Sequence, residues 1–101
     1  MATYTEIVSQ LEAFTGRRGS SIYAFARLLL IQTKEQCNHM YPLIQETAKV
    51  MGYSYYTVNN YVSYVCKLLQ SSTYFNMEVS YYRSERVNIL ELVNICCEYF
   101  K

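Results

Sequence analysis

The sequence is short of charge and of the residue patterns that mark enzymes. Charged residues make up 17% of the 101 positions, where about a quarter is usual. The net charge of +1 is far from the strongly basic balance that nonspecific binding to phosphate backbones would produce. There is no Gly-rich phosphate loop, paired-carboxylate motif or nucleophile elbow, and a single histidine does not define a catalytic apparatus. We therefore expect neither an enzyme nor a cofactor.

Signals for export and for membrane insertion are missing as well. The N-terminus has no basic segment followed by an apolar run, and the apolar stretch at residues 28–31 is far too short to cross a bilayer. The four cysteines show no regular spacing, and Cys66 and Cys97 fall in apolar helical patterns, where a free thiol behaves as a small hydrophobe. We expect reduced cysteines, a cytoplasmic location and no membrane partner.

A zinc site is the alternative interpretation of the cysteines. Cys37 and His39 could join Cys96 and Cys97 in a set of four ligands. Neither pair has the usual spacing of about two to four residues between thiolates. We therefore expect no bound metal.

The residues that are abundant are apolar and aromatic. Hydrophobic residues make up 51% of the chain, and twelve residues are tyrosines; this is enough apolar material for one compact core. Tyrosine offers a large flat contact area and a hydroxyl at low entropic cost, so a tyrosine-rich surface suits recognition of bases or of another protein. No repeat or Pro/Gly-rich linker divides the chain, so residues 1–101 are expected to form a single domain.

Apolar residues recur at helical spacing in five segments, which predicts a mainly α fold. Thr3 and Glu6 form a capping box, Ser20 or Ser21 caps the second helix, and Pro42 fits the first turn of the third. The predicted helices are residues 4–14, a second ending near residue 32, a third ending at residue 51, residues 55–70, and residues 84–100.

One segment has a different period. In residues 74–82, Phe75, Met77, Val79 and Tyr81 alternate with polar residues. A period of two is typical of a half-buried strand. This segment is the only strand that we predict.

The turn between the third and fourth helices has a specific residue at each special position. A small residue at Ala48 lets two helices cross closely, Gly52 supplies the left-handed backbone of a tight turn, and Ser54 caps the next helix. Tyr53 packs beneath the turn. Apolar residues fill the angle between the two helices: Val58, and Tyr61 or Val62.

This segment resembles the bacterial and phage helix-turn-helix family, whose regulators often read Ala-x-x-x-Gly-x-Ser-x-x-Thr-Val-x-x-Tyr-aliphatic. Residues 48–62 follow that pattern, and the unit extends over about residues 45–69 within a motif of about 43–70. The resemblance implies a tri-helical helix-turn-helix core, and the periodicity adds an N-terminal and a C-terminal helix to it. It also implies that the fourth helix enters the major groove of DNA with its N-terminal turns against base edges.

On that helix the residues opposite the apolar face are polar or aromatic. They are expected to contact DNA, together with the cap: Ser54, Tyr55, Tyr56, Asn59, Asn60 and Ser63. Asparagine can pair bidentately with adenine, and tyrosine can touch a thymine methyl or donate to phosphate, so an A·T-rich site suits this surface. The face has no arginine, the residue most often used to read guanine, so recognition of a protein by the same face remains the alternative.

Cations elsewhere are candidate contacts to the DNA backbone. Lys49 and Lys67 lie at the edges of the motif, and Arg17 and Arg18 lie between two glycines. Each of these could also be simply solvated.

A wing is a further alternative. If residues 87–92 formed a second strand, Arg83 and Arg86 would lie at the tip of a small β-hairpin, over the minor groove, as in a winged helix. A last helix over residues 84–100 is favoured, because a polar stripe keeps helical spacing for four turns. Its members are Asn88, Glu91, Asn94, Glu98 and Lys101.

The rest of that last helix is apolar on nearly every side, so it needs a cover. A second copy of the chain could supply it, and a homodimer would place two recognition helices about 34 Å apart, which matches a palindromic site. Burial against the first two helices of the same chain is the alternative.

The expected function is sequence-specific binding of double-stranded DNA, as a transcriptional regulator of a bacterium, plasmid or phage. The competing hypothesis is a protein-interaction module of the same fold, such as a phage-encoded inhibitor that presents its tyrosines to a host protein. The two differ in salt response, because neutralisation of phosphates makes DNA affinity fall steeply as salt rises.

Overall fold

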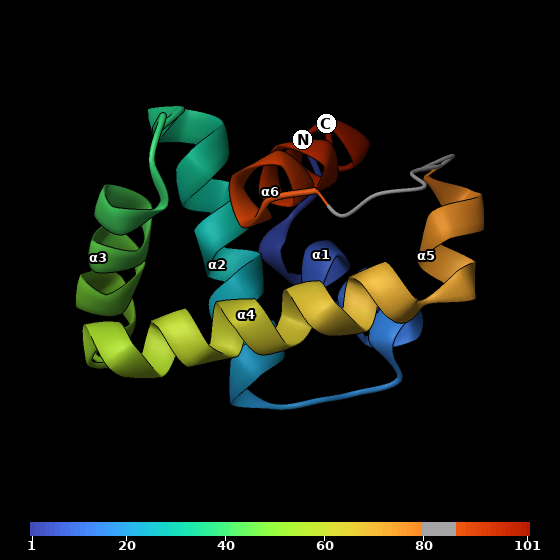
Figure 1. The fold of residues 1–101 in the computed structure, drawn as a ribbon, viewed down its shortest axis with the longest axis horizontal. Coiled ribbons are helices and arrows are strands. Elements are labelled where there is room, and N and C mark those ends of the chain that lie inside the picture. The colour runs from blue at the N-terminus through green and yellow to red at the C-terminus, as the bar shows by residue number, and fades with distance from the viewer. Residues whose placement is uncertain (80–86) are drawn as a thin grey trace.

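The computed structural model describes residues 1–79 and 87–101, and within these residues every regular element is a helix. Figure 1 shows how they are arranged. The helices are α1 (Tyr4–Thr15), α2 (Ser20–Glu35), α3 (Met40–Met51), α4 (Tyr55–Ser71), α5 (Thr73–Glu78) and α6 (Ile89–Tyr99). The predicted mainly α fold is confirmed.

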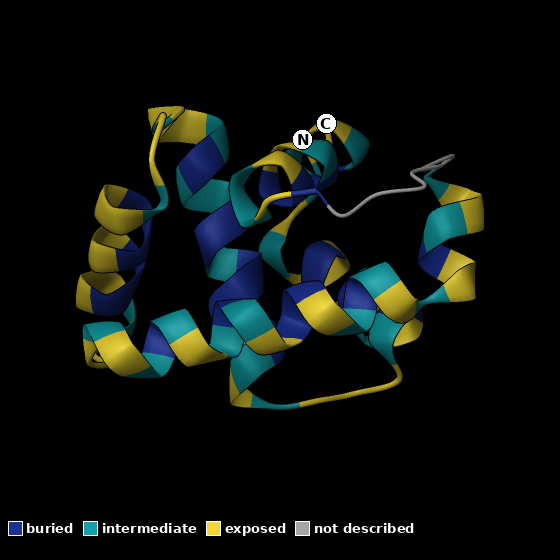
Figure 2. Cartoon of the chain, viewed as in Figure 1, coloured by how far each residue is buried: buried dark blue, intermediate teal, exposed yellow. Residues whose placement is uncertain are grey.

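Helix α2 is the centre of the molecule. It contacts α1, α3, α4 and α6, and α3 and α4 also contact one another. Its buried positions lie on several sides of the helix, as Figure 2 shows, because neighbours cover it from several directions. They include Ala24, Phe25, Ala26, Leu28 and Leu29. One apolar core therefore serves all six helices.

The ends of the chain lie side by side (Figure 1). The predicted capping box is present at α1, where the side chain of Thr3 accepts from the backbone of Glu6 and the Glu6 carboxylate accepts from the backbone of Thr3. The backbone N–H of Ala2 donates to the carbonyl of Phe100 at 2.8 Å. This bond joins the start of α1 to the end of α6.

Helix α2 differs from its prediction at both ends. Its N-cap is Gly19, with φ of 111° and no side-chain cap bond, so the predicted cap at Ser20 or Ser21 is wrong. The helix also runs to Glu35, three residues beyond the predicted end. The reason lies in Gln32, whose buried carboxamide accepts from the backbone N–H of Cys37 and donates to the carbonyl of Cys37, both at 2.9 Å. The connection to α3 is thereby held against the last turn of α2.

The predicted strand is wrong over its described part, since residues 74–78 belong to helix α5. Ser72 caps this helix by accepting from the backbone of Phe75 at 3.1 Å, and the same hydroxyl donates to the carbonyl of Phe14 at 2.7 Å. Phe75 is buried while Met77 is 69% exposed, so the two do not share a face as an alternating strand requires. Residues 80–82 of the predicted strand lie outside the described residues.

Helix α6 begins later than predicted. Asn88 is its N-cap and accepts from the backbone of Glu91 at 2.8 Å; the predicted start at Ser84 lies outside the described residues. A second strand over residues 87–92 is wrong, because residues 89–92 are helical. The predicted polar stripe is confirmed, since all five of its residues are exposed.

The apolar side of α6 is covered within one chain, by α2 and α4. Leu92, Val93 and Cys96 are buried there. A second copy is therefore not required to cover this helix, and the packing argument for a homodimer no longer holds.

Candidate functional site

The bend between α3 and α4 is made by Gly52, as predicted. Its φ of 74° and ψ of 26° are left-handed, a conformation that glycine adopts without the steric cost of a Cβ. The carbonyl of Ala48 accepts from the backbone N–H groups of both Gly52 and Tyr53. These bonds satisfy the end of α3 and turn the chain sharply into α4 (Figure 1).

Ser54 then starts α4 as its N-cap. Its hydroxyl oxygen accepts from the backbone of Thr57 at 3.1 Å, and the hydroxyl donates to the side chain of Thr57 at 3.0 Å. Val58 and Val62 fill the angle between the two helices and are fully or almost fully buried. Tyr61 is only partly buried, so Val62 rather than Tyr61 is the second filler.

The outer side of α4 carries a row of exposed residues at helical spacing, which we call the α4 stripe. It comprises Tyr56, Asn60, Tyr64, Lys67 and Ser71. Tyr56 is the more exposed of its two tyrosines, at 78%. The predicted outward set overlaps this stripe at Tyr56 and Asn60, whereas Tyr55, Asn59 and Ser63 are partly buried. The exposed face is thus rotated slightly from the predicted one and reaches further along the helix.

The polar groups of this face differ in their availability. The carboxamides of Asn59 and Asn60 make no hydrogen bond to any other described residue, and Tyr56 has no ring partner among them. The hydroxyl of Ser54, in contrast, is already hydrogen-bonded to Thr57 in the helix cap. The predicted role of Ser54 in contacting a ligand therefore competes with its role in the fold.

Two pairs of tyrosines flank the N-terminal half of α4, and only Tyr55 of the four was among the predicted contact residues. The rings of Tyr41 on α3 and Tyr55 lie 5.2 Å apart and tilted. The rings of Tyr53 and Tyr61 meet edge to face at 5.8 Å. Both pairs form because the bend at Gly52 brings α3 and the turn against α4.

Arg17 is brought to the same face from the connection between α1 and α2. Its Nε donates to the hydroxyl of Tyr64 at 3.1 Å, and Figure 1 shows this connection running along the same side of the molecule as α4. The neighbouring Arg18 is exposed and has no hydrogen bond or ion pair among the described residues. Of the predicted pair of arginines, Arg17 thus belongs to the same surface as the fourth helix.

The other predicted cations lie in different parts of the molecule. Lys49 is exposed on α3, and Lys67 is itself a member of the stripe. Arg83 and Arg86, predicted for a wing, lie outside the described residues. The guanidinium of Arg27 lies elsewhere, over the ring of Tyr4 at 4.3 Å from the centroid.

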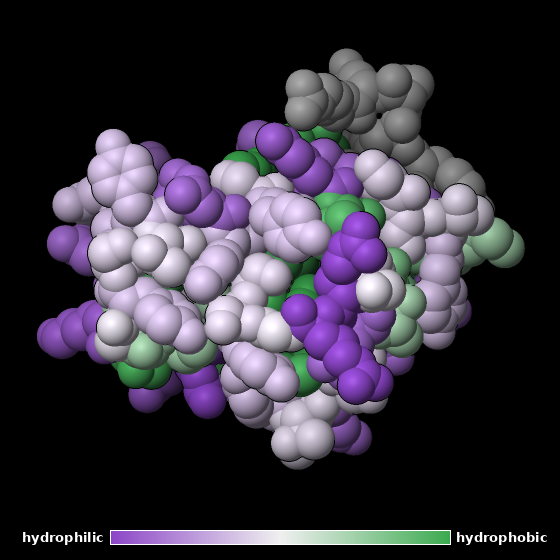
Figure 3. Space-filling model, turned by 90° about the horizontal axis from the view of Figure 1, so that it is seen from below, coloured by the Kyte–Doolittle hydropathy of each residue, from purple (hydrophilic) through white to green (hydrophobic). Residues whose placement is uncertain are grey.

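The charges of the chain are unevenly distributed, although they nearly cancel overall. Residues 13–34 and 47–77, which contain most of α2 and all of α4, include six of the nine lysines and arginines and none of the eight glutamates. The surface on the α4 side is covered mainly by weakly hydrophilic side chains, with a strongly hydrophilic band towards one side (Figure 3). This separation was readable in the sequence and is masked by the net charge of +1.

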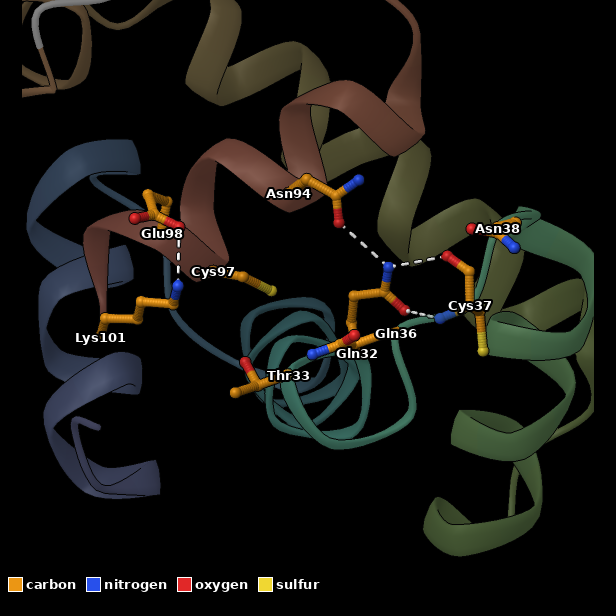
Figure 4. A pocket seen from close by; sticks show the side chains of 9 residues that line it. All are labelled: Gln32, Thr33, Gln36, Cys37, Asn38, Asn94, Cys97, Glu98 and Lys101. Atoms are coloured by element: carbon orange, nitrogen blue, oxygen red, sulfur yellow. Dashed lines mark hydrogen bonds and ion pairs between the residues drawn. The ribbon is translucent and has the colours of Figure 1, made fainter.

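A hollow of about 350 Å³ lies elsewhere, between the C-terminal ends of α2 and α6 (Figure 4). Several of its polar groups are already engaged: Gln32 donates to the side chain of Asn94 at 3.0 Å, and Lys101 pairs with Glu98 at 3.1 Å. Cys37 and Cys97 line it from opposite sides (Figure 4). Among the described residues, no three His, Cys, Asp or Glu side chains are grouped so as to hold a metal ion.

The buried thiols of the core are expected to be unreactive. Burial raises the pKa of Cys66 to about 12 and holds the pKa of Cys96 well above its usual value. The four cysteines are free thiols. Because the thiolate is the reactive form, Cys66 and Cys96 act as small apolar residues of the core.

No protein-family model, curated protein or solved structure matches this chain. Within residues 1–79 and 87–101, no helix combines the length and the apolar character needed to span a membrane.

Proposed function

We propose that this chain binds double-stranded DNA with sequence specificity, and that α3, the turn at Gly52 and α4 act as a helix-turn-helix. One observation carries the proposal: α4 presents an exposed stripe of tyrosine, asparagine and lysine that contains no carboxylate. Carboxylates on a helix that enters a groove would be repelled by the flanking phosphates. The turn residues at Ala48, Gly52 and Ser54 support the same interpretation.

In this mode α4 lies in the major groove with its N-terminal half against the bases. Asn60 pairs with adenine through its unengaged carboxamide, and Tyr56 contacts a thymine methyl or a backbone sugar. Lys49 and Lys67 neutralise phosphates on either side. A site rich in A·T pairs fits these side chains, and control of transcription in a bacterium, plasmid or phage is the role that such a small regulator would have.

Selection of bound sites from random duplexes at a stated salt concentration tests the proposal. We expect enrichment of one motif, and we expect Asn60→Ala to weaken binding to that motif by about ten- to a hundredfold. Asn38→Ala is the matched control, because Asn38 is exposed in the connection between α2 and α3, away from α4, and should leave affinity unchanged. If no motif is enriched, or if both variants behave alike, sequence-specific binding through α4 is rejected.

The second candidate function is recognition of a protein by the same face. Two observations favour it: the α4 stripe has no arginine, and two tyrosine pairs widen the aromatic surface beside it. A phage-encoded inhibitor of a host protein would use the surface in this way. Affinity for DNA that is weak and identical across sequences would favour this alternative.

The oligomeric state is decided by the same selection. A palindromic motif with half-sites about 10 base pairs apart indicates a homodimer on DNA, whereas a single half-site indicates a monomer. Light scattering of the free protein at micromolar concentration gives the state without DNA.

A further inference from the structure

We propose that Arg17 and Tyr64 together bind one phosphate of the DNA backbone, at the rim of the groove that α4 occupies. The inference rests on the proposed function and names two residues that fix where the backbone lies. Tyr64 would be a positioning residue for Arg17 as well as a donor in its own right.

The two side chains leave complementary donors free. Nε of Arg17 donates to the hydroxyl oxygen of Tyr64 at 3.1 Å, and the terminal nitrogens of the guanidinium have no partner among the described residues. Tyr64 accepts this bond, so its own O–H remains free to donate. A phosphate offers several acceptor oxygens and could take both donors at once, through charge-assisted bonds that are stronger than neutral ones. Accepting from a cation also polarises the phenol and makes it a better donor.

Two hydrogen bonds restrain Arg17 before any ligand binds. Its backbone N–H donates to the side chain of Thr15 at 3.2 Å, and its Nε donates to Tyr64 at 3.1 Å. Arg17 therefore loses less conformational freedom on binding than an arginine at the end of an unrestrained loop would lose.

The position along α4 fits a phosphate rather than a base. Tyr64 follows Tyr56 by eight residues, which is about 12 Å along a helix axis, so it lies beyond the N-terminal turns that a recognition helix directs at base edges. When the N-terminal turns of α4 face the base edges, Tyr64 and Arg17 reach the groove rim, where the phosphates lie.

The charges around Arg17 and Tyr64 indicate that the phosphate lies on the α4 side of the pair. Glu12 lines a hollow of about 420 Å³ together with Arg17 and Arg18, on the α1 side of the connection. It makes no ion pair with either arginine in the described part of the chain. A carboxylate in that hollow repels a phosphate, so the phosphate is expected on the α4 side, where residues 47–77 carry no acidic group.

The test is the salt dependence of duplex binding, measured by fluorescence anisotropy on the selected site. Arg17→Gln should lower the magnitude of the slope of log affinity against log salt by about 0.9, the value of one phosphate contact. The set of preferred sequences should not change, because phosphate contacts carry no base information. Lys34→Gln is the matched control: it removes the same charge from an exposed position in the last turn of α2 and should leave the slope unchanged.

Tyr64→Phe separates positioning from charge. It keeps the ring and removes the hydroxyl, so affinity should fall about three- to tenfold, while the salt slope stays near that of the unmodified chain. In the double variant the loss should be smaller than the product of the two single losses, because both residues act on one phosphate.

The outcomes distinguish the two levels of the proposal. If the unmodified chain binds duplex DNA and Arg17→Gln keeps the full slope, the phosphate site is wrong and the proposed function stands. If Arg17→Gln and Lys34→Gln lower the slope equally, the effect is one of overall charge, and the site is again wrong. If the unmodified chain binds no duplex at any salt concentration, both the function and the site are rejected.

Discussion

The turn into α4 and the turn into α5 are both capped by a serine, yet only the first was recognisable in the sequence. Ser54 and Ser72 accept from the backbone N–H three residues ahead at the same distance, 3.1 Å. Ser54 follows Gly52 by two residues, whereas Ser72 ends one helix and begins the next without a glycine, at φ of −83°. A serine therefore predicts a helix start only when a second signal, such as a left-handed glycine or a long apolar period, accompanies it.

The helix that follows each cap makes the same point. Helix α4 has 17 residues and buries five of them at helical spacing, which the pattern can report. Helix α5 has six residues and buries only Phe75. A single buried residue has no period, so the alternation of residues 74–82 was the stronger pattern there, although it was misleading.

Replacement of Phe75 by alanine is the largest test of this comparison. Phe75 is 1% exposed, and its ring meets that of Phe14 at 5.2 Å, so Phe75→Ala should lower the free energy of unfolding by about 3–5 kcal/mol. Met77→Ala should change it by less than about 0.5 kcal/mol, because that side chain is exposed. Urea denaturation followed by circular dichroism measures both. In a strand, Phe75 and Met77 would share the buried face. Comparable losses of unfolding free energy from both variants would therefore favour the predicted strand over helix α5.

The two caps themselves provide the next test. Ser54→Ala should cost about 1 kcal/mol, the usual value of an N-cap. Ser72→Ala should lower the free energy of unfolding by about 2 kcal/mol, because it removes the cap and also the hydroxyl that donates to the carbonyl of Phe14 at 2.7 Å. Thermal unfolding would separate them, since about 1 kcal/mol shifts the midpoint by roughly 4–8 °C in a domain of this size. Ser71→Ala is the control, because Ser71 is exposed in α4 and caps neither helix. Equal losses from the two cap variants would show that the bond to Phe14 adds nothing.

Much of the fold followed from local rules. The capping box at α1, the end of α3 at Gly52 and the start of α4 at Ser54 were predicted because each depends on residues within one turn of one another. The extension of α2 to Glu35 was not predicted, because it depends on Gln32 binding the backbone of Cys37 and the side chain of Asn94 in α6.

The candidate site also contains residues that local sequence rules predict and a contact that only the packed fold creates. Tyr56 and Asn60 followed from helical spacing, and Tyr64 lies four residues further in the same stripe, so the sequence already contained the signal for it. The bond between Arg17 and Tyr64 joins residues 47 positions apart. No local pattern predicts such a contact, because it exists only once α1, α2 and α4 have packed together.

The smallest expected effect on the free energy of unfolding concerns Cys66 of α4, which lies in the core that α4 and α5 share. Burial raises the pKa of this thiol to about 12 from an ordinary value of 9.0. A raised pKa means that the unfolded chain releases the proton first as pH rises, so the stabilising contribution is complete below pH 9 and is lost progressively between pH 9 and about 12. At pH 9.5 the loss from this thiol should be about 0.8 kcal/mol. In urea titrations at pH 7.5 and pH 9.5, Cys66→Ala should reduce the pH-dependent loss by that amount, whatever its effect on stability at pH 7.5. An unchanged loss in the variant would mean that water or a nearby cation already stabilises the thiolate, and that α4 packs on the core less tightly than its buried residues indicate.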